Sequence, residues 1–85
     1  ACRSGGGMTI AANKVVGARA VTVTTTEEVK HARQDNDANI ISLPGDWITR
    51  DRAEHIVRLF LETPFSGAER HTRRVQQIHQ YEEKN

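Results

Sequence analysis

The 85-residue sequence holds a single cysteine, Cys2, so an internal disulfide cannot form and a disulfide-rich secreted scaffold is excluded. Its apolar runs are only a few residues long, whereas a membrane-spanning helix needs about 20 apolar residues. The first seven residues are polar and glycine-rich rather than basic and then apolar, so no secretory signal is expected. We therefore expect a soluble protein of a reducing, cytoplasmic compartment, with no membrane partner.

Neither sign of charge is in excess, because 12 Lys and Arg stand against 11 Asp and Glu. Nucleic-acid binders that rely on bulk electrostatics usually show a clustered basic excess, so no nucleic-acid partner is expected. Aromatic residues are also scarce, and a chain of this length buries only about 60–65% of the surface of its unfolded form. The length and composition therefore predict one small domain with a thin core. Such a core suggests that a partner subunit or a further segment of chain helps to stabilise it.

Strand-like and helix-like segments alternate along the chain. Residues 8–16 predict a short helix, with Gly17 as its left-handed stop. Residues 18–24 and 39–43 are rich in β-branched side chains and predict two strands. Apolar spacing and end signals predict three further helices, over residues 26–34, from a cap at Thr49 to a stop at Pro64, and over residues 69–84.

Two strands joined through a helix pair in parallel, with a right-handed crossover. A parallel sheet needs helices on both faces, and two strands are too few to make a stable one. A glycine loop that opens a helix normally follows a strand, and here none precedes it. The residues alone therefore predict an α/β fold, similar to the C-terminal part of a doubly wound domain.

Three consecutive glycines, Gly5, Gly6 and Gly7, precede the first predicted helix. Backbone N–H groups converge in such a loop, which suits a phosphate or a developing oxyanion. The same field would lower the pKa of Cys2 and favour its thiolate. A flexible tail with an idle thiol explains the same residues, and the pattern does not decide between the two.

Other polar clusters also allow two interpretations. Arg70, Arg73 and Arg74 share one face of a predicted helix, where they form either a phosphate clamp or a solvated basic surface. The polar residues 35–39 suit a turn between helix and strand. The four histidines lack H-x-x-x-H spacing and there is no second cysteine, so no metal site is expected.

Six short motifs stand in order along the chain: C-x-S-G-x-G-M-x-I-A-A-N-K (2–14), G-x-R-A (17–20), N-D-A-N (36–39), F-L (60–61), P-F-x-G (64–67) and R-H-x-x-R-V (70–75). Together they resemble the C-terminal portion of the ribose-5-phosphate isomerase B and galactose-6-phosphate isomerase family. The resemblance implies a three-layer α/β/α Rossmann-like parallel sheet without the family's N-terminal strand–helix units. Residues 1–85 would then be a single domain or the C-terminal half of one.

The resemblance also implies an activity. It implies aldose–ketose isomerisation of a phosphorylated sugar, of the ribose 5-phosphate and ribulose 5-phosphate type, through an enediolate and without metal or cofactor. A homodimer or homotetramer with active sites between subunits is expected. The alternatives are a non-catalytic homologue that binds a sugar phosphate and a partner subunit of a heteromeric isomerase.

Particular residues match the family's functional positions. Cys2 matches the base that moves a proton between C1 and C2, Ser4 matches a hydroxyl residue beside it, and Asp35 stands at a third catalytic position. The positions that match substrate contacts are Gly5, Gly6 and Gly7 in the oxyanion loop, Asn36 and His71, and the phosphate-binding Arg70 and Arg74, which act across the dimer.

Three positions depart from the family pattern, and Glu69 looks like an insertion. Arg3 stands where the family usually has glycine, and Asp46 where it commonly has arginine. Asp35 replaces a histidine that helps to open the furanose ring. An ionised aspartate accepts a proton but does not readily donate one, so its presence suggests a substrate that cannot cyclise, such as a four-carbon sugar phosphate.

Overall fold

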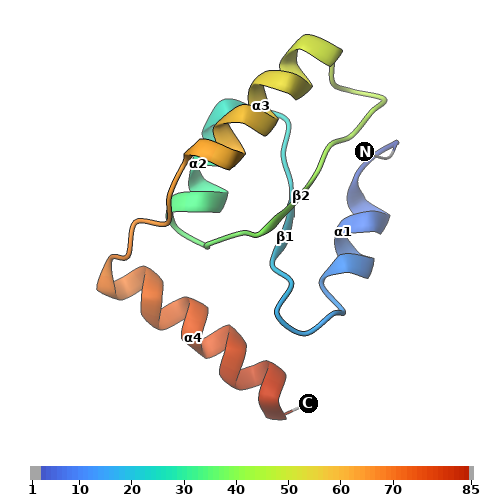
Figure 1. Ribbon diagram of the computed structural model, residues 1–85. Coiled ribbons are helices and arrows are strands. Elements are labelled where there is room, and N and C mark those ends of the chain that lie inside the picture. Colours follow the sequence, from blue (N-terminus) through green and yellow to red (C-terminus); the bar gives the residue numbers. More distant parts are fainter. Residues whose placement is uncertain (1–2, 85) are drawn as a thin grey trace.

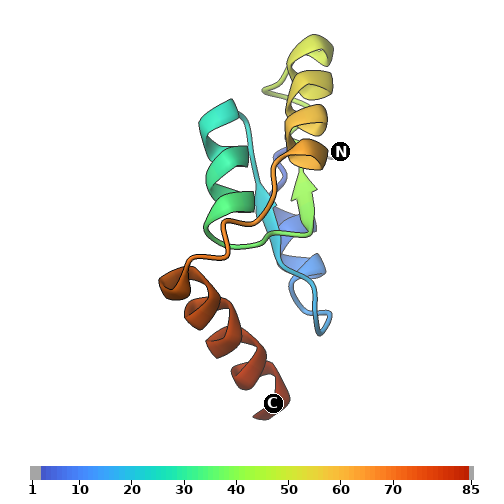
Figure 2. The same ribbon diagram turned by 60° about the vertical axis from the view of Figure 1, so that its left-hand side comes forward.

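A computed structural model describes residues 3–84 and shows a two-stranded parallel sheet with helices on both faces (Figures 1 and 2). The elements in chain order are α1 (Gly6–Ala12), β1 (Ala20–Thr22), α2 (Thr26–Gln34), β2 (Ile40–Ser42), α3 (Arg50–Glu62) and α4 (Glu69–Lys84). The strands pair in parallel from Ala20 with Ile40 to Thr22 with Ser42. The predicted α/β class and α/β/α layering are confirmed.

The side chains of the two strands alternate between the faces of the sheet. Thr22 and Ser42 point toward α1, where Thr9 Oγ1 lies 2.7 Å from Thr22 Oγ1 and donates to Ser42 Oγ at 2.9 Å. Val21 and Ile41 come one residue earlier in each strand, and they pack against the hydrophobic core on the other face. One face of the sheet is therefore joined to its helix by hydroxyl groups and the other by apolar contacts.

The hydrophobic core lies between the sheet, α2 and α3. Its buried members are Val23, Val29, Ala32, Ala38 and Ile56. Full burial of an aliphatic side chain such as Ile56 contributes about 1.5–3 kcal/mol relative to exposure. Leu59 and Phe60 of α3 cover the cluster from the side. The core is as thin as the length and composition predict.

The starts of α2 and α3 follow the sequence signals. Thr25 caps α2 by accepting a hydrogen bond from the N–H of Glu28 at 3.1 Å, and Glu28 Oε1 accepts one from the N–H of Thr25 at 3.0 Å. Hydrogen bonds to Glu28, that of the Thr24 hydroxyl first, lower the pKa of its carboxyl group. Thr49 caps α3 as predicted, and the helix ends at Glu62, two residues before Pro64.

The first helix differs from its prediction at both ends: it begins at Gly6, so that two of the three glycines are helical, and it ends at Ala12 rather than near Val16. The helix ends there because the side-chain amide of Asn13 forms hydrogen bonds with the backbone of β1. Asn13 Oδ1 accepts from the N–H of Ala20 at 2.7 Å, and Nδ2 donates to the Ala20 carbonyl at 2.9 Å. Gly17 does adopt the predicted left-handed conformation, at φ 88°, but in the turn that leads into β1.

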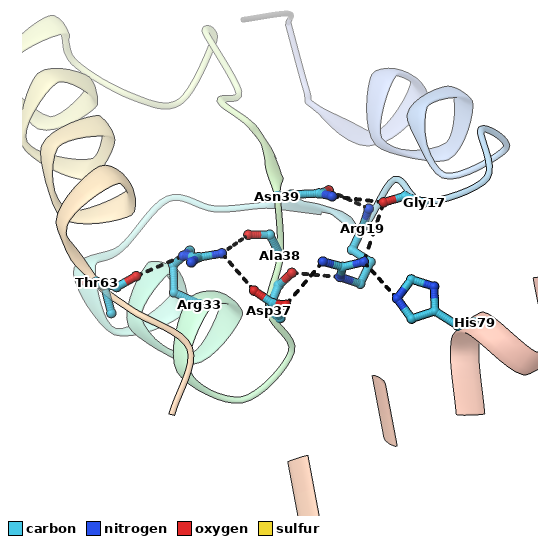
Figure 3. Close-up of polar contacts among 8 residues, drawn as sticks. All are labelled: Gly17, Arg19, Arg33, Asp37, Ala38, Asn39, Thr63 and His79. Atoms are coloured by element: carbon cyan, nitrogen blue, oxygen red, sulfur yellow. Dashed lines mark hydrogen bonds and ion pairs between the residues drawn. The ribbon is translucent and has the colours of Figure 1, made fainter. Parts of the chain in front are cut away.

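A junction of polar side chains ties the end of α2 to the end of α3 (Figure 3). Arg33 donates from Nε to the Thr63 carbonyl at 2.9 Å, and from Nη1 to the Ala38 carbonyl and to Asp37 Oδ1. Its guanidinium also lies over the Phe60 ring, 5.6 Å from the centroid. With its side chain only 20% exposed, Arg33 satisfies two backbone carbonyls that no helix or strand ladder reaches.

The same junction continues through Asp37 to the start of β1. Asp37 has a φ of 49°, which is rare for a residue with a side chain. Arg19 secures this turn by donating from Nε to the Asp37 carbonyl at 2.7 Å and from Nη2 to Asp37 Oδ2 at 3.3 Å. Arg19 Nη1 also lies 3.3 Å from His79 Nε2 on α4.

The fourth helix lies apart from the other three (Figures 1 and 2). A few polar contacts hold it, among them the bond from the Gly17 N–H to Glu82 at 2.8 Å. Of its predicted apolar edge, Val75 is buried, whereas Ile78 and Tyr81 are largely exposed. Within residues 3–84, no helix has the length and apolar character to cross a membrane.

We predict that Arg33→Lys destabilises the protein, because lysine cannot reach the Ala38 and Thr63 carbonyls together. Leaving one of these carbonyls buried without a donor costs about 1–3 kcal/mol in the free energy of unfolding, measurable by urea denaturation. Arg58→Lys on the exposed surface of α3 is the matched control, with an expected change below about 0.5 kcal/mol. Equal stabilities of the two variants would contradict the importance of the junction.

Candidate active site

The glycine loop lies at the sheet edge where the two strands end. Gly5 caps α1 with a left-handed φ of 87°, and its carbonyl accepts a hydrogen bond from Thr22 Oγ1 at 3.2 Å. A Cβ atom on Gly5 would lie only 2.6 Å from Thr22 Cγ2. Both the conformation and the close approach therefore require glycine at this position.

The other residues of the loop face solvent. Ser4, Gly6 and Gly7 are exposed, and a Cβ on Gly7 would meet no atom within 4 Å. The segment thus presents exposed backbone at the start of α1. Cys2 itself lies outside the described residues, so its predicted role stays a prediction.

The two charged departures at this edge contact each other. Arg3 Nε lies 3.3 Å from Asp46 Oδ2, and the N–H of Asp46 donates to the Arg3 carbonyl at 3.0 Å. Their side chains are 91% and 47% exposed, so the ion pair adds little to stability. Its effect is local, because the positive charge beside the glycine loop is balanced and the loop is joined to the segment after β2.

A second group of predicted site residues gathers at the opposite edge of the sheet. Asp35 ends α2, with Oδ2 3.0 Å from His31 Nδ1 and Oδ1 3.6 Å from His71 Nε2. The hydrogen bond from His31, followed by the charges of His71, His31 and Arg70, lowers the pKa of the Asp35 carboxyl group. Asp35 is therefore ionised at neutral pH and acts as an acceptor.

His71 is fixed from two sides. Its Nδ1 lies 2.8 Å from Ser66 Oγ, and its Nε2 faces Asp35. The Ser66 N–H donates to the Gln34 carbonyl at 3.1 Å, so the loop before α4 is attached to the end of α2. These contacts set the first turn of α4, and the exposed Arg70 and Arg74 lie in its first two turns.

Two members of this network, His31 and Ser66, were not among the predicted site residues. The spacing of His31 and Asp35 is i and i+4, which places both on one face of a helix and could have indicated the pair. The contact between Ser66 and His71 depends on a loop conformation that no spacing rule gives. Asn36 is exposed beside Asp35, on the same edge.

The two groups do not meet within one chain. Helix α2 starts at the edge that carries the glycine loop and ends at Asp35, and its nine residues span about 13 Å. Gly5 contacts Thr22 at the end of β1, whereas residues 35–39 lead into the start of β2. One chain therefore holds the two groups of predicted site residues on opposite edges of its sheet (Figure 1).

Among the residues that the structure describes, no group of three His, Cys, Asp or Glu side chains is placed to hold a metal ion. The histidine and carboxylate groups at the end of α2 instead form hydrogen bonds and ion pairs with one another. What the two edges can offer chemically is anion binding and proton transfer.

The fold and the motifs place this chain in a class of proteins related to sugar isomerases. Residues 1–78 match the model of the Ribose/Galactose Isomerase family, and the chain belongs to this family. It is 43% identical over 79 residues to ribose-5-phosphate isomerase B of Mycobacterium leprae, covering 93% of this chain and 49% of that protein. It is 40% identical over 84 residues to the putative sugar phosphate isomerase YwlF of Bacillus subtilis, covering 99% of this chain and 56% of that protein.

Solved structures give the same result. The type B ribose 5-phosphate isomerase of Trypanosoma cruzi matches with a TM-score of 0.95 and 42% identity, over 99% of this chain and 56% of that chain. Ribose-5-phosphate isomerase B of Mycoplasma genitalium, with bound ribulose-5-phosphate, matches with a TM-score of 0.94 and 37% identity, over 99% and 55%. The chain thus spans about half the length of the relatives it matches, as its resemblance to a portion of the family predicts.

We predict that Gly5→Ala and Gly7→Ala have opposite effects on the free energy of unfolding. Alanine at position 5 combines a left-handed φ with a clash against Thr22, and should destabilise by about 2 kcal/mol or more. Alanine at position 7 lies in open space within α1 and should stabilise by about 0.5–1 kcal/mol. Chemical denaturation of both variants measures the difference, and similar effects would contradict the geometry of the loop.

Proposed function

We propose that this protein interconverts an aldose phosphate and a ketose phosphate, of the ribose 5-phosphate and ribulose 5-phosphate pair. Membership of the Ribose/Galactose Isomerase family carries the proposal. Relatives named ribose-5-phosphate isomerase B share 42–43% identity with nearly the whole chain. The Mycoplasma genitalium relative binds ribulose-5-phosphate, which is one member of the proposed pair.

The proposed reaction moves a proton between two neighbouring carbons. Cys2 as thiolate removes the proton from C2 of the open-chain aldose and returns it to C1, with an enediolate between the two steps. The proton of the C2 hydroxyl group passes to O1 in the same sequence, so that the C2 carbonyl of the ketose forms. The backbone N–H groups of the Gly5, Gly6 and Gly7 segment would stabilise the enediolate oxygen, with Ser4 beside it. Each proton removed is returned, so the step needs no external oxidant or reductant.

We propose that two copies of the chain complete each site. The loop at residues 3–7 and the group formed by Asp35, Asn36 and His71 lie on opposite edges of one sheet, too far apart to contact one small substrate together. A symmetric dimer can place the loop of one copy against the second group of the other. Arg70 and Arg74 at the start of α4 would then bind the phosphate from the neighbouring copy.

The charged departures are compatible with this proposal. A lone Asp46 carboxylate beside the glycine loop would repel a sugar phosphate. Because Arg3 pairs with Asp46, the net charge of the two side chains is zero. The loop can therefore still receive an anionic intermediate.

The direct test is an assay of the complete protein with ribose 5-phosphate, in which ribulose 5-phosphate is measured. Turnover that saturates with substrate supports the proposal. A folded protein that binds the sugar phosphate without converting it would contradict the proposal and favour the non-catalytic homologue. Activity that appears only after a second family member is added would favour the heteromeric isomerase.

We predict that Cys2→Ala abolishes proton transfer but retains substrate binding. Loss of a general base typically lowers the rate by about 100-fold to 10,000-fold. Exchange of the C2 proton of ribose 5-phosphate with deuterated water, followed by NMR, measures the step directly. Calorimetric titration of the same variant is the control for binding, and full residual exchange would show that the base is another group.

We also predict that two inactive variants restore activity when they are mixed. A dimer of one Cys2→Ala chain and one Arg70→Ala chain contains one site in which both residues are intact, if each site draws on two chains. Random mixing would then recover about a quarter of the wild-type activity, because half of the dimers are mixed and each has one intact site. No recovery after unfolding and joint refolding would contradict a site between copies.

A further inference from the structure

We propose that His31 is the catalytic residue that opens the furanose ring of the sugar phosphate. The inference rests on the proposed function and names one further residue of that site. It starts from Asp35, an ionised carboxylate that accepts a proton but does not readily donate one, so that ring opening at this edge needs another acid–base group. The structure places a histidine one helical turn earlier, in direct contact with that aspartate.

The contact between His31 and Asp35 fixes the orientation of the imidazole ring. Asp35 Oδ2 lies 3.0 Å from His31 Nδ1, and because an ionised carboxylate only accepts, Nδ1 is the donor. In the neutral ring, Nε2 is then the nitrogen with a free lone pair. Histidine bases in other enzymes are oriented by carboxylates in the same way.

His71 is less suited to this step. Both of its ring nitrogens have partners, since Nδ1 lies 2.8 Å from Ser66 Oγ and Nε2 lies 3.6 Å from Asp35 Oδ1. Its side chain is only 13% exposed, whereas that of His31 is 74% exposed. Within residues 3–84, His31 Nε2 has no hydrogen-bond partner, and this exposed nitrogen can reach a ligand.

His31 lies within the second group of predicted site residues, around Asp35, Asn36 and His71. The His31 and Asp35 pair lies in the last turn of α2, directly before Asn36. Arg70 lies close enough for its charge to act on Asp35. A sugar whose phosphate is held by the arginines at the start of α4 would have its ring near this turn.

The ring-opening step needs only one proton. Nε2 of neutral His31 takes the proton from the C1 hydroxyl while the C1 carbonyl forms and the bond from C1 to the ring oxygen breaks. The resulting imidazolium, stabilised by the Asp35 carboxylate, gives the same proton to the ring oxygen, which becomes the C4 hydroxyl. Bonds and protons balance, and His31 returns to its starting state.

The test separates ring opening from proton transfer at carbon. Ribulose 5-phosphate cannot form a furanose ring because its O5 carries the phosphate, so exchange of its C1 hydrogen with deuterated water needs no ring step. We expect His31→Ala to lower kcat/KM for the conversion of ribose 5-phosphate by about 100-fold. Because exchange at C1 of ribulose 5-phosphate needs no ring opening, the ratio of that exchange rate to the rate of ribose 5-phosphate conversion should rise by a similar factor. Asp35→Asn, which retains an acceptor but not the charge, should shift this ratio in the same direction by less.

His55→Ala is the matched control, because His55 is an exposed histidine on α3. Unchanged conversion in His31→Ala, or an equal loss of exchange and conversion, would overturn the assignment. So would a selective loss of conversion in His71→Ala but not in His31→Ala. A wild-type protein with neither exchange nor conversion would overturn the proposed function as well, which distinguishes that failure from a wrong choice of histidine.

Discussion

The placement of Arg33 is the constraint on which the rest of this small fold depends. Among residues 3–84, the hydrophobic cluster between the sheet, α2 and α3 has five buried members, and polar contacts add to the apolar ones that hold these elements together. Arg33 donates hydrogen bonds to the Ala38 carbonyl, just before β2, and to the Thr63 carbonyl, just after α3. Its guanidinium group also lies over the Phe60 ring. Asp37 extends the junction to Arg19, at the start of β1. The turn that carries Asp35 and Asn36 is thereby held at a defined place on the sheet edge.

That placement has a consequence for function. In a parallel sheet the two edges differ, and the helix between the strands carries the chain from one edge to the other. The glycine loop lies at one edge and the group around Asp35 at the other. Under the proposed function, each copy of the chain would supply two different halves of a site, and an assembly of identical copies would unite them. The proposed phosphate contacts of Arg70 and Arg74 and the glycine loop could then serve one reaction without touching in one chain.

Much of the fold could be predicted from local signals. The cap at Thr49, the stop near Pro64 and the β-branched strands act through neighbouring backbone atoms, and each was confirmed within a few residues. The end of α1 was predicted wrongly, because Asn13 uses its amide for Ala20, a contact that reaches beyond the helix. The departures from the family pattern could be read as three separate changes at positions 3, 35 and 46. In the structure, two of them form one ion pair, and the third joins His31 and His71.

The sequence by itself determined the order of helices and strands, the α/β class and the family, because periodicity, caps and ordered motifs are local properties of the chain. It also determined which side chains could take part in the chemistry. Only the tertiary structure decided which of them meet. The pairing of Arg3 with Asp46 joins residues 43 positions apart, and that of His71 with Asp35 joins residues 36 positions apart. Contacts of this kind follow from the way in which loops and helices are arranged around the sheet and from the sheet register, which no local pattern specifies.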